Sequence, residues 1–169
     1  GFAIYRTKKF LDSFYDGKKY SVYAKTGDPK TKYKTTKDTV SWVKEAQERG
    51  AGEIVLNCIN QDGVRKGYDL EQLSLIRKQI NIPLIASGGA GKKEDFLDVF
   101  ENNCVDGALA ASIFHKKIIS IGEVKKFRIY INFKNFFKFN QIQTQDIILD
   151  KVDFNIKKSD LSFFTNLLK

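Results

Sequence analysis

The sequence has 169 residues, of which 42% are hydrophobic and 29% charged, and its formal net charge is +9. This length suits a single domain with a sizeable core, and the hydrophobic fraction excludes a disordered chain. Composition also argues against a transmembrane helix or a signal peptide, since no long uncharged apolar run is present and the first ten residues carry three basic side chains.

The first predicted elements are a hairpin and a helix. An apolar run at residues 10–13 is followed by Asp16 and Gly17, a dipeptide typical of a hairpin turn, and then by an alternating strand at residues 18–25. Residues 39–47 carry apolar side chains at helical spacing, and the Arg-Gly pair that follows favours helix termination.

Strands and helices then alternate as far as residue 127. In chain order we predict a strand at 53–57, a helix at 70–80, a strand at 83–86, a helix at 94–100, a strand at 105–113 and a helix that begins at 121–127. This alternation predicts an α/β fold with a parallel sheet. Four βα units cannot close a (βα)8 barrel, which needs about 250 residues, so we expect half of such a barrel.

The composition changes near residue 123. All twelve glycines lie at or before Gly122, and the rest of the chain is rich in Phe, Lys, Asn and Ile. We therefore predict a patterned domain at residues 1–126 and a separate tail at residues 127–169. A shifted reading frame is one hypothesis for the tail, and a basic, aromatic module that stacks on single-stranded nucleic acid is another. Because methionine is absent, we also expect a processed or partial chain.

The positive charge favours an anionic partner, but the residue types do not favour nucleic acid. Most of the charge comes from lysine, whereas bidentate contacts to bases and phosphates prefer arginine. Cys58 and Cys104 are far apart and the sequence has one histidine, so the ligands of a zinc site are lacking. We expect reduced thiols in a cytoplasmic protein, with no metal, no cofactor and no membrane partner.

Two consecutive strand ends predict a phosphate site. Ser87, Gly88 and Gly89 lie between a strand and a helix, where backbone amides and a helix N-terminus favour an anion. Ala111 and Ser112 end the next predicted strand and add small side chains and a hydroxyl. The pairing matches the phosphate site that (βα)8 barrels form after strands seven and eight. An ordinary glycine-rich turn remains the alternative.

Carboxylates also follow or open predicted strands. Asp12 ends the first apolar run, where it is placed for acid/base work or, alternatively, serves as a cap. Asp62 and Gly63 lie in a long polar loop, which either binds substrate or simply turns the chain. Glu53 opens a buried strand at the opposite end, where it is either an exposed edge residue or a charge in the barrel floor that needs a cationic partner, and the sequence reveals no obvious partner. His115 lies beside two lysines, and we expect it to be solvated rather than a catalytic base.

Several segments in combination resemble the cyclase subunit of imidazole glycerol phosphate synthase. They are residues 49–57, 60–63, 67–69, 85–91, 106–115 and 121–123. The resemblance covers about residues 10–127 and implies the C-terminal half, strands five to eight, of a (βα)8 barrel. It also implies that ammonia from a glutaminase partner cyclises a bis-phosphorylated ribotide. The products are imidazole glycerol phosphate and aminoimidazole carboxamide ribotide, in histidine biosynthesis.

The same resemblance implies roles for individual residues. Asp12 would be one of two acid/base aspartates, Asn57 would contact the substrate, and Glu53 would gate the passage of ammonia. One substrate phosphate would be held by residues that follow the strands: Asp62, Gly63, Ser87, Gly88, Gly89, Ala111 and Ser112. The second aspartate belongs to the half that the resemblance does not cover, so we expect no useful cyclisation by this chain alone. An inactive phosphate-binding half barrel and a paralogue that serves surface-sugar biosynthesis remain alternatives.

Overall fold

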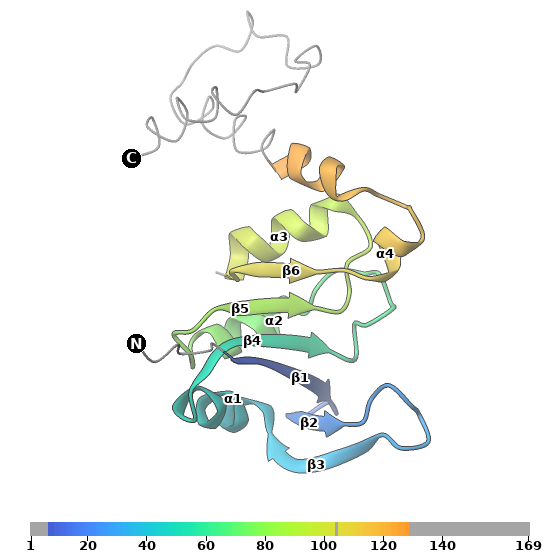
Figure 1. The fold of residues 1–169 in the computed structure, drawn as a ribbon. Helices are drawn as coiled ribbons and strands as arrows, with labels where there is room; N and C mark the ends of the chain where they lie inside the picture. The colour runs from blue at the N-terminus through green and yellow to red at the C-terminus, as the bar shows by residue number, and fades with distance from the viewer. Residues whose placement is uncertain (1–6, 104, 129–169) are drawn as a thin grey trace, which may run out of the picture. The chain divides into compact units, whose positions relative to one another are not determined.

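A computed structural model describes residues 7–103 and 105–128 of the chain. The chain comprises two units, residues 1–124 and 125–169. The first contains a six-stranded sheet with the order β3-β2-β1-β4-β5-β6 (Figure 1). The predicted tail at 127–169 lies, from residue 129 onward, outside the described residues.

The strands are β1 (Thr7–Tyr15), β2 (Tyr20–Ala24), β3 (Tyr33–Asp38), β4 (Ala51–Cys58), β5 (Leu84–Ser87) and β6 (Gly107–Leu109). The helices are α1 (Thr39–Glu48), α2 (Leu70–Arg77), α3 (Lys93–Asn103) and α4 (Ser112–His115), and residues 121–128 are also helical. Strands β1, β4, β5 and β6 pair in parallel, whereas the β2–β3 hairpin is antiparallel to β1. A helix follows each of the parallel strands β4, β5 and β6 directly and follows β1 after the β2–β3 hairpin, so the predicted α/β half barrel is confirmed.

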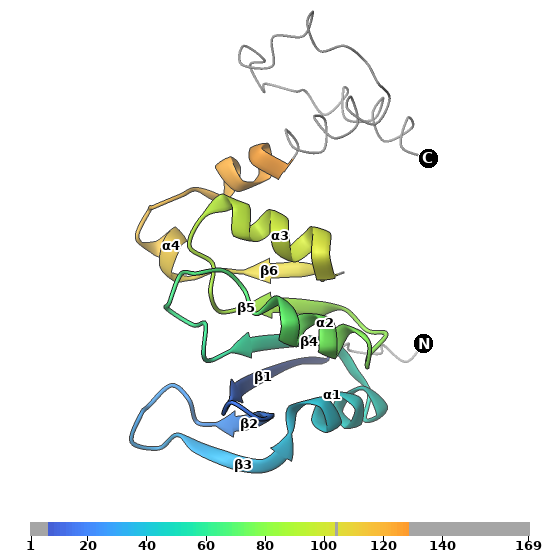
Figure 2. The ribbon, with the colours of Figure 1, turned by 180° about the vertical axis from the view of Figure 1, so that it is seen from behind.

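The core lies between the sheet and the helices on one of its faces. Helix α2 lies behind the sheet in Figure 1 and in front of it in Figure 2. Alternate strand residues face the helices, because successive side chains of a strand point to opposite faces. The main contributors are Leu11, Ile54, Leu56, Leu84 and Ala86 from the strands, and Val43, Leu73, Ile76 and Val99 from the helices. The opposite face of the sheet is left for Phe10, Asp12, Val55 and Asn57, all of which line a pocket.

A buried polar cluster joins β1 to two helices. The hydroxyls of Ser13 and Thr39 are 2.8 Å apart, and the amide of Gln72 donates to the Ser13 hydroxyl. All three side chains are almost fully buried. An unpaired buried polar group lowers the stability of the fold. These bonds therefore specify how α1 and α2 pack against β1, the strand that carries Asp12.

Two predicted elements need correction, and one strand was not predicted. The strand predicted at 105–113 ends at Leu109, and Ser112 instead begins α4. Ile113 is fully buried as a helical residue, and a short apolar run cannot distinguish such a turn from a strand. Strand β3 was not predicted, because its polar side chains are mostly exposed and only pairing with β2 makes it a strand. The helix predicted at 70–80 ends at Arg77.

Candidate functional site

The carboxyl ends of the parallel strands bring four residues into one row. The register pairs Asp12 with Asn57, Asn57 with Ser87, and Ser87 with Leu109. These side chains lie on the face that the helices do not cover, and they line a pocket of about 300 Å³. The pocket therefore forms at the end of the sheet where (βα)8 barrels bind their substrates.

Nine of the ten residues singled out from the sequence line this one pocket. They are Asp12, Asn57, Asp62, Gly63, Ser87, Gly88, Gly89, Ala111 and Ser112. Five further residues complete the lining: Phe10, Val55, Ala90, Leu109 and Ala110. Phe10 was not predicted as a site residue, because an apolar residue in a strand is usually buried in the core. Its side chain is instead 72% exposed. Its position two residues before Asp12 was the available signal, since residues i and i+2 share a face.

The Asp12 carboxylate is held by two donors. The side-chain amide of Asn57 donates to Oδ1 at 2.9 Å, and the hydroxyl of Thr26 donates to Oδ2 at 2.6 Å. Asn57 comes from β4, and Thr26 comes from the loop that joins β2 to β3. The carboxylate can accept about four hydrogen bonds, so capacity for a ligand remains on both oxygens. The arrangement suits proton transfer to or from a bound molecule.

The glycine-rich segment after β5 packs closely against the backbone at the end of β4 and in the loop that follows β4. Gly88 and Gly89 have φ values of +87° and +117°. A Cβ at residue 88 would lie 2.8 Å from the carbonyl oxygen of Cys58, and one at residue 89 would overlap the carbonyl oxygen of Gly67. Glycine is therefore required at both positions by conformation and by space.

The donors that this segment offers differ from those expected. The amides of Gly91 and Lys92 donate to the Asp95 carboxylate at 2.7 and 3.0 Å, so Asp95 occupies the donors at the start of α3. The backbone amides of Gly89 and Ala90 have no hydrogen-bond partner within the described residues. An anion in the pocket would thus be bound by the loop amides rather than by those that Asp95 occupies.

Glu53 lies at the other end of β4, away from the pocket. Its register partner on β1 is Lys8, and Lys8 Nζ is 3.0 Å from Glu53 Oε1. Lys8 is therefore the cationic partner of Glu53 that the sequence did not reveal. Pairing between residues 8 and 53, which are far apart in the sequence, created this contact, and no local pattern reports such pairing.

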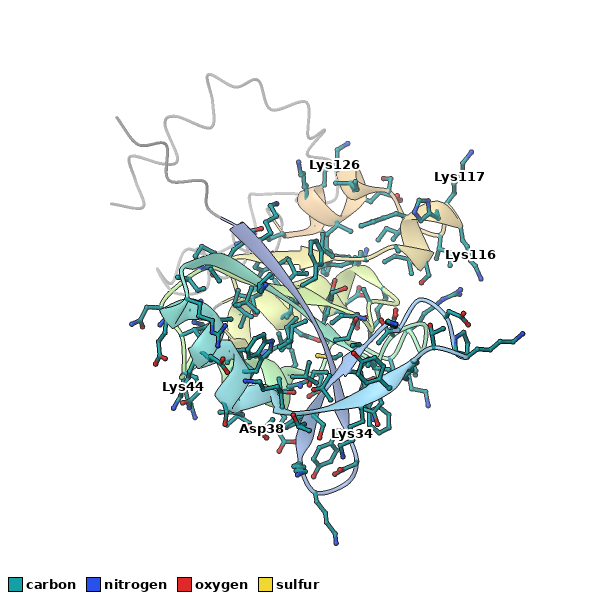
Figure 3. All side chains as sticks on the ribbon, turned by 60° about the horizontal axis from the view of Figure 1, so that its bottom comes forward. Lys34, Asp38, Lys44, Lys116, Lys117 and Lys126 are labelled. Carbon is teal, nitrogen blue, oxygen red and sulfur yellow. The ribbon has the colours of Figure 1, made fainter. Side chains whose placement is uncertain are left out.

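The remaining candidate groups do not reach the pocket. His115 is exposed at the end of α4, and the neighbouring Lys116 and Lys117 extend away from the sheet (Figure 3). Cys58 is a free, buried thiol whose burial raises its pKa, whereas Cys104 lies outside the described residues. Within residues 7–103 and 105–128, no cluster of three or more His, Cys, Asp or Glu side chains could hold a metal ion. In that same part of the chain, no helix has the length and apolar character needed to cross a membrane.

Comparisons with known proteins agree on one family. The model of the family described as "Histidine biosynthesis protein" matches residues 11–120. The chain is 63% identical over 119 residues to the imidazole glycerol phosphate synthase subunit HisF of Pseudoalteromonas translucida, covering 69% of this chain and 46% of that relative. The proteins of the same name in Pectobacterium carotovorum and Escherichia coli are each 58% identical over the same length and with the same coverage. The chain thus spans about half the length of the curated relatives that it matches.

Proposed function

Because the chain belongs to the histidine biosynthesis protein family, we propose that it supplies the second half of the cyclase subunit of imidazole glycerol phosphate synthase. The observation that carries the proposal is the pocket, which gathers one carboxylate held by two donors and a glycine loop whose Gly89 and Ala90 amides have no partner among the described residues. A carboxylate beside an anion site suits acid/base chemistry on a phosphorylated substrate.

In the proposed reaction, ammonia cyclises a bis-phosphorylated ribotide to imidazole glycerol phosphate and releases aminoimidazole carboxamide ribotide. Asp12 would accept and return protons, with Asn57 orienting both Asp12 and the substrate. The amides of Gly89 and Ala90, together with Ser112, would hold one phosphate group of the substrate. The second acid/base aspartate and the other phosphate site would come from the part of the relatives that this chain does not match.

The proposal extends to ammonia delivery. Glu53 lies at the opposite end of β4 from the pocket, where a glutaminase partner would dock and release ammonia. Its ion pair with Lys8 would serve as the charged constriction that ammonia passes. As a biosynthetic subunit, the chain would act in the cytoplasm, which agrees with the free thiol of Cys58.

Reconstitution tests the proposal. The chain would be co-expressed with the portion of the Pseudoalteromonas translucida relative that it does not match, and assayed with an ammonium salt and the bis-phosphorylated ribotide. We expect imidazole glycerol phosphate to form, and Asp12→Asn to lower turnover by about 100-fold or more. Asp98→Asn is the matched control, because Asp98 is an exposed aspartate of α3 outside the pocket. Full activity of Asp12→Asn would contradict the assigned role.

A second candidate function is phosphate binding without catalysis, favoured by the 46% coverage of the relatives. An NMR titration of the chain alone with inorganic phosphate, together with the turnover of the reconstituted enzyme, distinguishes phosphate binding alone from the cyclase function. Shifts at Gly89 and Ala90 without turnover in the reconstituted enzyme would support the binding function. Turnover that rises further when a glutaminase and glutamine replace the ammonium salt would support the full synthase.

A further inference from the structure

Thr26 was not among the residues singled out from the sequence, yet it contacts the central carboxylate of the pocket. Its Oγ1 donates to Oδ2 of Asp12 at 2.6 Å, while Nδ2 of Asn57 donates to the other oxygen at 2.9 Å. The two donors come from separate parts of the fold, since Thr26 follows β2 and Asn57 belongs to β4. Together they hold both oxygens of a single carboxylate.

A local turn explains how Thr26 reaches Asp12. The register pairs Asp12 with Tyr23, and Thr26 lies three residues beyond Tyr23. Along a straight strand, Thr26 would be carried about 10 Å past Asp12. Lys25 instead adopts a φ of +55°, a conformation that a lysine rarely takes. This residue ends the extended path of β2 and turns the Thr26 hydroxyl back toward the carboxylate.

The loop that carries Thr26 is closed by its own hydrogen bonds. The backbone carbonyl oxygen of Asp28 accepts from the amides of Thr31 and Lys32 at 3.1 and 2.9 Å. The Asp28 carboxylate accepts from the amide of Lys30 at 2.9 Å. The loop therefore holds its shape without contacts to a ligand, and it presents the hydroxyl in a defined place.

We propose that Thr26 is a positioning residue that orients the Asp12 carboxylate for proton transfer. The inference rests on the proposed function, in which Asp12 is the acid/base group. Two donors on two oxygens restrict both side-chain torsions of Asp12, and each oxygen keeps a lone pair for the substrate. Because proton transfer depends on the placement of the carboxylate, losing one donor should reduce turnover more than substrate binding.

The first experiment tests the positioning in the chain as it exists. NMR would follow the carboxyl carbon of Asp12 and the side-chain amide of Asn57 in three variants. Thr26→Val keeps the shape of the side chain and removes the donor, and Thr26→Ser keeps the donor. Thr31→Val is the matched control, because the Thr31 hydroxyl in the same loop bonds to the Asp28 backbone instead. We expect both signals to shift in Thr26→Val alone, and unshifted signals there would overturn the proposal.

Thr26 is only partly buried and lies in a surface loop, so these variants should fold. Thr26→Ala provides a second variant that lacks the hydroxyl donor. The second experiment uses the reconstituted enzyme. We expect Thr26→Val to lower kcat by about 10- to 100-fold while KM changes by less than about threefold. Thr26→Ser should restore most of kcat. Shifted NMR signals with an unchanged kcat would overturn the catalytic relevance of the positioning.

The two experiments separate failure of this inference from failure of the proposed function. A reconstituted enzyme that is inactive with Thr26 in place would overturn the proposed function. In that case, shifted Asp12 and Asn57 signals in Thr26→Val would still support Thr26 as the residue that orients the carboxylate.

Discussion

The backbone amide of Gly67 donates a hydrogen bond to the carbonyl oxygen of Gly89, with an N···O distance of 3.0 Å. This bond joins the loop after β4 to the loop after β5 at the pocket. Both residues have positive φ values, +103° and +117°. The two loops therefore meet backbone to backbone, and any side chain at residue 89 would enter the space that Gly67 occupies.

We predict that Gly89→Ala separates the two loops. The added methyl group would overlap Gly67 in a conformation that already disfavours alanine. We expect the free energy of unfolding to fall by about 2–4 kcal/mol and phosphate binding to be lost. Urea denaturation and a phosphate titration would measure these effects.

The control is Gly17→Ala, because Gly17 has a similar φ of +92° but no atom within 4 Å of the added methyl position. It should cost only about 1 kcal/mol, which is the effect of backbone conformation alone. Equal losses in the two variants would mean that the contact with Gly67 contributes nothing.

Arg77 connects the end of α2 to the chain that leads into β5. Its guanidinium donates to the carbonyl oxygens of Ile80 and Ile82 and pairs with Asp106 at 3.1 Å. We expect Arg77→Lys to lower the free energy of unfolding by about 1–2 kcal/mol, because an ammonium group cannot reproduce this planar set of bonds. Urea denaturation measures this loss, and Lys78→Arg, at the neighbouring exposed residue, is the control. A loss no larger than that of Lys78→Arg would contradict the prediction.

Asp16 gives the hairpin turn a dependence on pH. The backbone amide of Lys19, the ammonium group of Lys34 and the amide of Lys18 lower the pKa of Asp16 from 3.8 to about 2. A lowered pKa in the folded state means that this stabilisation is fully present above about pH 4 and is lost as the pH falls toward 2. The melting temperature of Asp16→Asn should therefore lie below that of the parent at pH 7, and the difference should shrink between pH 4 and pH 2. A constant difference across this range would be inconsistent with the assignment.

Cys58 should be unreactive while the chain is folded. Its thiol is buried, and burial raises its pKa, so at pH 8 it stays protonated and inaccessible. In a Cys104→Ser background, mass spectrometry should find little iodoacetamide adduct in buffer and full labelling in urea. Adding Lys30→Cys in an exposed loop provides a site that should react under both conditions. Rapid labelling of Cys58 in buffer would contradict its burial.

The sequence by itself determined the fold class and most of the residues that line the pocket. Strand and helix signals are local, because apolar spacing along a segment sets which face is buried. The residues that line the pocket follow strands, and the carboxyl ends of parallel strands meet at one edge. Asp12 and Ser87 could therefore be grouped before their register was known, and the resemblance to the cyclase subunit added Asn57.

Only the tertiary structure decided which groups touch. The ion pair of Lys8 with Glu53 and the bond from Thr26 to Asp12 depend on strand register and on one left-handed residue, Lys25. Strand β3 likewise exists through pairing with β2 rather than through its own polar sequence. The physical reason is that local patterns report burial, whereas a hydrogen bond or an ion pair requires placement to within about 1 Å. That placement is set by segments far apart along the chain.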